Sequence, residues 1–135
     1  MRTDRRFPAS RMHAAALAAA LVLAGCGGGV YWSIGGDDEP DVELAAQPEV
    51  VRSGETLELQ AGASGGVGSV VEVRFYRVDD NGARVLLGSD LDRPFRLTVR
   101  APTVTEPTAV RYQARAWDEW GNRGQSPTVT VTVQP

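Results

Sequence analysis

The chain has no lysine, a single histidine and a single cysteine, and the last two lie near its amino end at His13 and Cys26. Residues 41–135 therefore contain neither histidine nor cysteine. This excludes catalysis by a Ser-His or Cys-His pair, zinc sites with the usual ligands, and disulfide bonds within that region. We therefore expect a protein that is not an enzyme, with no cofactor and no metal centre.

Basic charge is scarce outside the amino terminus. All 14 basic residues are arginine, and four of them fall within the first eleven positions. Residues 26–135 keep 10 arginines against 16 acidic residues, which leaves a net charge of −6. An acidic chain of this kind is poorly suited to binding nucleic acid through phosphate contacts. The total of 135 residues fits one small domain with extensions.

An apolar run of eleven residues, 14–24, follows the arginine-rich start. As a helix, such a run rises only about 16 Å, whereas the hydrocarbon core of a bilayer is about 30 Å thick. A short apolar run after a basic start is the layout of a secretory signal peptide. Residues 1–25 are therefore expected to be a signal peptide rather than a transmembrane span.

The apolar run ends in Leu23, Ala24, Gly25 and Cys26, and these four residues resemble the lipobox of bacterial lipoproteins. The resemblance implies cleavage before Cys26 and attachment of diacylglycerol and a further fatty acid such as palmitate. Two or three acyl chains anchor a protein stably, where one chain is marginal. Gly27 in place of Asp goes with transfer to the outer membrane in lipoproteins of enteric-type bacteria. The resemblance thus implies a lipid-anchored envelope protein, at the outer membrane and facing the periplasm or the cell surface; the alternative is a chance cysteine after an alanine-rich helix.

Residues 26–40 are rich in glycine and then acidic. They contain too few periodic apolar residues to fold, so a flexible tether is expected there.

From residue 41 onward, apolar and polar residues alternate with a period of two, which is typical of strands with one face on a core and one in water. Asn81 and Gly82 predict a hairpin whose turn requires positive φ at both central residues. About seven strands in 95 residues predict an all-β, antiparallel β-sandwich. The strands are expected near residues 42–51, 55–62, 69–78, 84–89, 94–100, 108–117 and 126–134.

Residues 41–135 also resemble the bacterial Ig-like domains of exported proteins. The matching stretches are residues 53–57, 73–76, 93–95 and 114–122. The resemblance implies an Ig-like sandwich in a family whose members serve mostly as spacer and adhesion modules. Because a fold does not decide function, this resemblance identifies no ligand.

Two groups of acidic residues are candidates for a metal site or a catalytic site. The stretch 118–122, with Asp118, Glu119 and Asn122, offers oxygen ligands of the kind that Ca²⁺ prefers, but the same residues suit a tight turn, which we favour. The carboxylates of Asp79, Asp80, Asp90 and Asp92 would suit acid-base chemistry on a glycosidic bond only if a cleft held two of them at a set separation.

The outer face of one sheet is the better candidate for binding. If the strands 69–78 and 108–117 are neighbours, then Arg74, Tyr76, Arg111, Arg115 and Trp117 share a face turned away from the core. Arginine and aromatic residues are enriched in interface hot spots. An ordinary solvated face is the alternative explanation.

The sequence therefore predicts a membrane-anchored envelope lipoprotein with a non-catalytic interaction or structural module. Its expected partners are the membrane, through the lipid anchor, and an envelope protein or glycan, but not nucleic acid. The alternative is a module that binds carbohydrate or peptidoglycan through Trp117, Trp120 and Tyr76.

Overall fold

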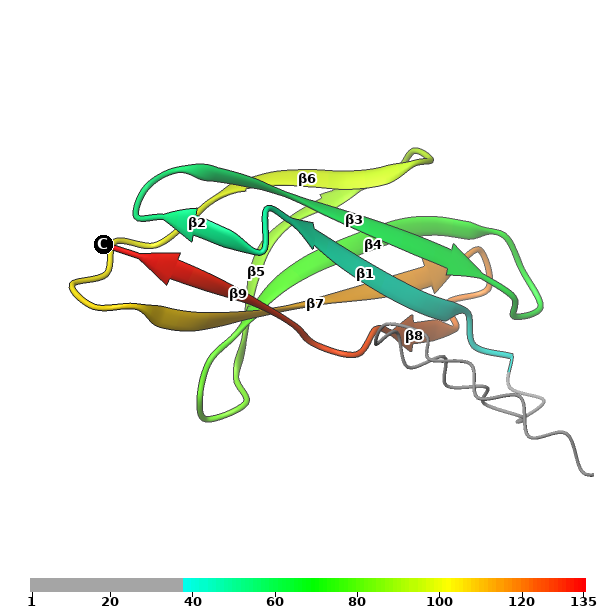
Figure 1. Cartoon of the computed structure of the whole chain (residues 1–135). Helices are drawn as coiled ribbons and strands as arrows, with labels where there is room; N and C mark the ends of the chain where they lie inside the picture. The colour runs from blue at the N-terminus through cyan, green and yellow to red at the C-terminus, as the bar shows by residue number, and fades with distance from the viewer. Residues whose placement is uncertain (1–37) are drawn as a thin grey trace, which may run out of the picture. The chain divides into compact units, whose positions relative to one another are not determined.

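The structure, a computed structural model, describes residues 38–135 and contains nine β-strands (Figure 1). The predicted signal peptide, the lipid attachment at Cys26 and most of the predicted tether lie outside the described residues. Within residues 38–135, no helix is long and apolar enough to cross a membrane. In chain order the strands are β1 (Asp41–Gln47), β2 (Val50–Arg52), β3 (Thr56–Ser64), β4 (Val70–Val78), β5 (Arg84–Asp90), β6 (Phe95–Arg100), β7 (Thr108–Asp118), β8 (Arg123–Gln125) and β9 (Val129–Gln134).

The strands form the two sheets of a β-sandwich. One sheet has the order β1-β3-β6, and the other has the order β2-β9-β7-β4-β5, with β8 pairing with β7. The chain passes from one sheet to the other after β1, β2, β3, β5 and β6. This is the connectivity of an Ig-like sandwich, so the predicted fold is confirmed. One detail differs from the prediction, because β2 and β9 run parallel instead of antiparallel.

Alternating side chains from both sheets fill the space between them. Every second residue of β3 is buried from Leu57 to Ala63, and on the other sheet Phe75 of β4 and Tyr112 of β7 are almost fully buried. Burial raises the pKa of the Tyr112 hydroxyl above its usual range, which the nearby charge of Arg77 partly opposes. The largest fully buried side chains are Tyr112, Phe75, Phe95, Leu57, Leu59, Val73, Val131 and Val133. Apolar burial between the sheets is therefore the main source of stability.

The first predicted strand, 42–51, proves to be two strands in different sheets. β1 pairs with β3, whereas β2 pairs with β9 on the opposite side of the sandwich. Pro48 lies between them and has no backbone N–H to donate to a ladder, so pairing stops there. The backbone N–H of Thr132 donates to Glu49 at 2.9 Å, which starts the new pairing.

Two local features also differ from the sequence prediction. In the β4–β5 turn only Gly82 has a positive φ, of 81°, and the turn is closed by hydrogen bonds between Asp79 and both Gly82 and Ala83. The turn is therefore longer than the two-residue hairpin expected. The short strand β8 was not predicted, because its three residues, Arg123, Gly124 and Gln125, show no alternation of apolar and polar side chains. A Cβ atom at Gly124 would overlap the backbone of Pro40.

The two ends of the sandwich are formed by different loops, and the described chain begins at one end and finishes at the other. The β3–β4, β5–β6 and β7–β8 loops meet at one end, since Asp41 pairs with Ser64 and Val70 pairs with Asp118 there. Residues 38–40 enter the domain at this same end, which we call the entry end (Figure 1, right side). The β2–β3, β4–β5 and β6–β7 loops and the carboxyl terminus form the far end.

Candidate interaction face

The five residues singled out in the sequence lie on the outer face of the larger sheet, and we call them the Arg–Trp face. β4 pairs with β7, as predicted, with Arg74 opposite Arg115. Tyr76 follows on β4, and Arg111 and Trp117 lie at the two ends of the same face of β7. All five side chains are partly exposed. The predicted residues are therefore brought together by the register of these two strands.

Arg74 is held in place by two neighbours. Its Nε and its terminal NH2 donate to the two carboxylate oxygens of Glu72 at 2.8 and 3.0 Å. The hydrogen bonds from Arg74 outweigh desolvation and keep the pKa of Glu72 below its usual range. The Arg74 guanidinium carbon also lies 4.4 Å from the centroid of the Trp117 ring, within cation–π distance. A paired carboxylate thus fixes the cation over the indole.

Arg115 lies beside the same ring, with its guanidinium carbon 5.9 Å from the Trp117 centroid. Its Nε atom is buried and has no hydrogen-bond partner among residues 38–135. Arg115 is also absent from the ion pairs found in the described part of the chain. A buried donor without an acceptor costs about 1–3 kcal/mol. Arg115 therefore keeps a positive charge that no acidic group among residues 38–135 neutralises.

Arg111 is turned toward the far end of the sandwich. Its terminal NH2 donates to the backbone oxygen of Asp79 at 2.8 Å and lies 3.5 Å from the carboxylate of Asp80, both in the β4–β5 turn. Because the Asp80 side chain is fully exposed, this ion pair is weak. Arg111 therefore supports the turn more than it contributes to the surroundings of Trp117.

A polar network on the same face was not identified from the sequence. Arg84 of β5 donates to the side-chain oxygens of Gln113 at 2.7 Å and of Gln125 at 3.2 Å. Gln113 in turn donates to the backbone oxygen of Ser126 at 2.9 Å, and Arg84 covers it so that only 7% remains exposed. Arg84 pairs with Val78 across the hairpin, and Val78 lies on the same face as Arg74 and Tyr76. This pairing could have placed Arg84 on the outer face.

The charges on this outer face are unbalanced. Six of the ten arginines in residues 38–135 hold positions on it, namely arginines 52, 74, 84, 111, 115 and 123. The paired acidic groups are Glu72 and the exposed Asp80. An acidic domain therefore gathers positive charge on one surface.

The stretch 118–122 forms a turn, as favoured, and leaves no free carboxylate at Asp118. One carboxylate oxygen of Asp118 accepts the backbone N–H groups of Trp120 at 2.9 Å and Asn122 at 2.8 Å, and the other accepts the Asn122 side-chain amide at 2.9 Å. Desolvation raises the pKa of Asp118, but these hydrogen bonds together outweigh it and the net pKa lies below its ordinary value.

The other acidic residues do not meet in one cleft. Asp79 and Asp80 lie in the β4–β5 turn at the far end, whereas Asp90 and Asp92 lie at the entry end, separated by the seven residues of β5. Seven residues of strand span about 23 Å. The pKa of Asp90 is lowered because its carboxylate accepts backbone N–H groups of Arg96 and Asp92. Within residues 38–135, no cluster of three or more acidic, histidine or cysteine side chains is arranged to hold a metal ion.

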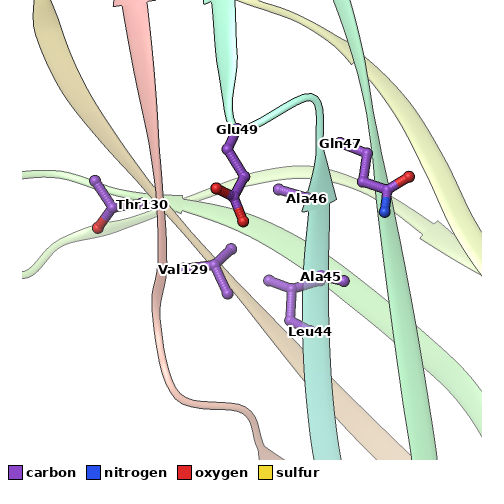
Figure 2. A pocket seen from close by; sticks show the side chains of 7 residues that line it. All are labelled: Leu44, Ala45, Ala46, Gln47, Glu49, Val129 and Thr130. Carbon is purple, nitrogen blue, oxygen red and sulfur yellow. The ribbon is translucent and has the colours of Figure 1, made fainter. Parts of the chain in front are cut away.

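A hollow of about 400 Å³ opens between β1 and β9, beside the point where the chain changes sheets. Figure 2 shows the Glu49 side chain between the two strands, and Glu49 is the one ionisable group in the lining. The other lining residues are Leu44, Ala45, Ala46, Gln47, Val129 and Thr130. A single carboxylate among small apolar and neutral side chains does not form a reactive site.

No protein-family model matches this chain, and no curated protein matches it. Among solved structures, it is similar to a chain from a study described as "Structural basis of T cell specificity and activation by the bacterial superantigen toxic shock syndrome toxin-1". That similarity covers 69% of this chain and 99% of the other chain, with a TM-score of 0.48 and 12% sequence identity.

Proposed function

We propose that this protein is a membrane-anchored envelope lipoprotein whose Ig-like sandwich is a non-catalytic interaction module. The lipobox resemblance at Cys26 supports the anchor. The observation that supports the module is the pair of arginines beside Trp117, of which Arg115 has no acidic partner among residues 38–135. The Arg–Trp face is the contact surface in this proposal.

The chemistry of the face favours an acidic protein partner. Guanidinium groups pair with carboxylates in a bidentate geometry, and an aromatic ring beside them supplies apolar contact area. Arg115 has no acidic partner within the described residues, so an incoming carboxylate would meet a cation that is not already neutralised. The outward position of the face also means that its residues are not needed to fill the core.

The same geometry counts against a carbohydrate platform. A sugar ring stacks on an aromatic face, and one side of Trp117 is taken by Arg74 at 4.4 Å. Trp120 lies in the β7–β8 turn against Gly68, not on the sheet face that carries Tyr76. Trp120 therefore lies on a different surface from Tyr76 and Trp117, so the three aromatic residues do not form one glycan platform.

Site-specific photo-crosslinking in envelope preparations tests this proposal. A photoreactive residue at Gln125, which is exposed and lies opposite Arg115, is expected to give a protein adduct, whereas one at the exposed Gln60 on the other sheet is not. Adding Arg115→Glu should abolish the adduct, because it places a carboxylate where an acidic partner binds. The matched control Arg96→Glu, on the opposite sheet, should leave it intact.

Equal adducts at Gln60 and Gln125, or an adduct that survives Arg115→Glu, would contradict the proposed contact surface. Melting curves of both charge-reversal variants show whether a loss of the adduct reflects unfolding instead.

A further inference from the structure

The entry end of the sandwich carries an unusual share of exposed apolar surface. Seven large apolar side chains are exposed within residues 38–135, and four of them lie at this end. Trp120 is 71% exposed, Leu91 65%, Val67 61% and Val71 45%. Single exposed apolar side chains are ordinary, but a group of them on one end of a domain marks a contact surface.

Val71 lies at the start of β4, and the other three residues come from three loops that are held by hydrogen bonds. The backbone N–H of Glu119 donates to Ser69 at 3.0 Å, which joins the β7–β8 turn to the β3–β4 loop. Arg93 donates from the β5–β6 loop to the backbone oxygen of Ala63 at 2.9 Å. The Trp120 ring lies so close to Gly68 that a Cβ atom at position 68 would overlap it. The apolar side chains are therefore presented outward by a fixed framework.

The chain enters the domain beside the same loops. The backbone of Asp38 passes Gly66 closely enough that a Cβ atom there would lie 3.0 Å from the Asp38 oxygen. Cys26 precedes Asp38 by twelve residues. Twelve residues span at most about 43 Å even when fully extended. A lipid on Cys26 would therefore hold the entry end nearer to the bilayer than the far end.

We propose that the entry end rests in the headgroup region of the bilayer that holds Cys26, with Trp120, Leu91 and Val67 in contact with lipid. This inference rests on the lipid anchor of the proposed function. Tryptophan is favoured at the interface because its ring is apolar and its N–H finds polar partners there.

The charges at the entry end indicate which lipids it contacts. The entry end is acidic, with exposed carboxylates on Asp38, Glu39, Asp41, Asp92 and Glu119, and its Arg93 is already hydrogen-bonded to backbone. The end therefore lacks the basic cluster that attracts anionic lipids. The contact is apolar, so it forms with zwitterionic lipid and changes little with ionic strength.

Fluorescence quenching by brominated lipid tests the contact. The full chain, produced in a bacterial host and purified from membranes, is reconstituted into phosphatidylcholine vesicles that contain brominated acyl chains. One variant, Trp32→Phe with Trp117→Phe, keeps Trp120 alone. Its emission is expected to shift to the blue and to lose intensity relative to vesicles without bromine.

The matched control, Trp32→Phe with Trp120→Phe, keeps Trp117 on the sheet face and should show neither change. The quenching of Trp120 should persist at high salt. Quenching of Trp120 no stronger than that of Trp117 would overturn the proposal, as would emission of Trp120 that responds to added envelope protein but not to lipid.

The proposed lipid anchor at Cys26 and the proposed bilayer contact of the entry end are tested by separate measurements. Mass spectrometry of the purified chain shows whether Cys26 carries lipid; an unmodified Cys26 overturns the proposed anchor. Since Cys26 is the single cysteine, its thiol can then be coupled to maleimide-bearing lipid. Absence of Trp120 quenching in chains anchored by either route refutes the bilayer contact itself.

Discussion

Replacing Trp117 with Thr separates the binding role of this residue from its contribution to stability. Fully burying a large apolar side chain is worth about 1.5–3 kcal/mol. Trp117 is only partly buried, on the outer face, and threonine has a high preference for strands. We therefore expect a net loss of about 1 kcal/mol, which lowers the melting temperature by about 4–8 °C in a domain of this size.

The reference for this measurement is Phe75→Ala, on the inner face of the neighbouring strand. Phe75 is fully buried, and such truncations cost about 3–5 kcal/mol. Thermal unfolding followed by circular dichroism gives both values, and crosslinking from Gln125 gives the binding result. Trp117→Thr should lose the crosslink while keeping most of the stability. If it destabilises the protein as much as Phe75→Ala and leaves the crosslink unchanged, then Trp117 is a core residue and the Arg–Trp face is not a contact surface.

Three further predictions follow from the anchor, the domain boundary and the β7–β8 turn. Cys26→Ser should abolish incorporation of labelled fatty acid and move the protein out of the membrane fraction, and unchanged labelling would rule out this attachment site. A chain of residues 41–135 alone should unfold cooperatively and give a β-type far-ultraviolet spectrum, because the core residues all lie within it; a helical spectrum or no transition would refute this. The pKa of Asp118 is lowered by folding from its ordinary value of 3.8, so its stabilising effect is present above that value and is lost as the pH falls through the folded pKa. Asp118→Asn should therefore weaken the acid dependence of the melting temperature below about pH 4, and an unchanged pH profile would show that the carboxylate does not organise the turn.

The alternation of side chains made the sandwich predictable, because a residue's face in a strand follows from its sequence position alone. The same rule placed Arg74 and Arg115 on one face, given that their strands are neighbours. Pro48 marked a break that alternation across residues 42–51 did not reveal, since the two halves keep an apolar pattern while pairing with different sheets.

The entry end could not be predicted in this way. Val67, Leu91 and Trp120 are separated by more than 20 residues from one another, and each looks like an isolated apolar residue in a loop. Only the order of the strands brings the three loops together. The Arg84–Gln113 contact is similar, since it depends on β5 lying beyond β4 and on the length of the side chain that reaches across.

The change of sheet after β1 has a mechanical consequence. The chain enters at the entry end, and β9 runs toward the far end, parallel to β2. A force that pulls the carboxyl end away from the entry end therefore slides β9 along β2 instead of peeling the two strands apart. The ladder from Val50 to Arg52, continued by the Ser53 N–H bond to Gln134 at 2.7 Å, bears that load on all its hydrogen bonds at once. Such a junction yields at a higher force than a hairpin that unzips one bond at a time, and single-molecule pulling on the domain would measure the difference.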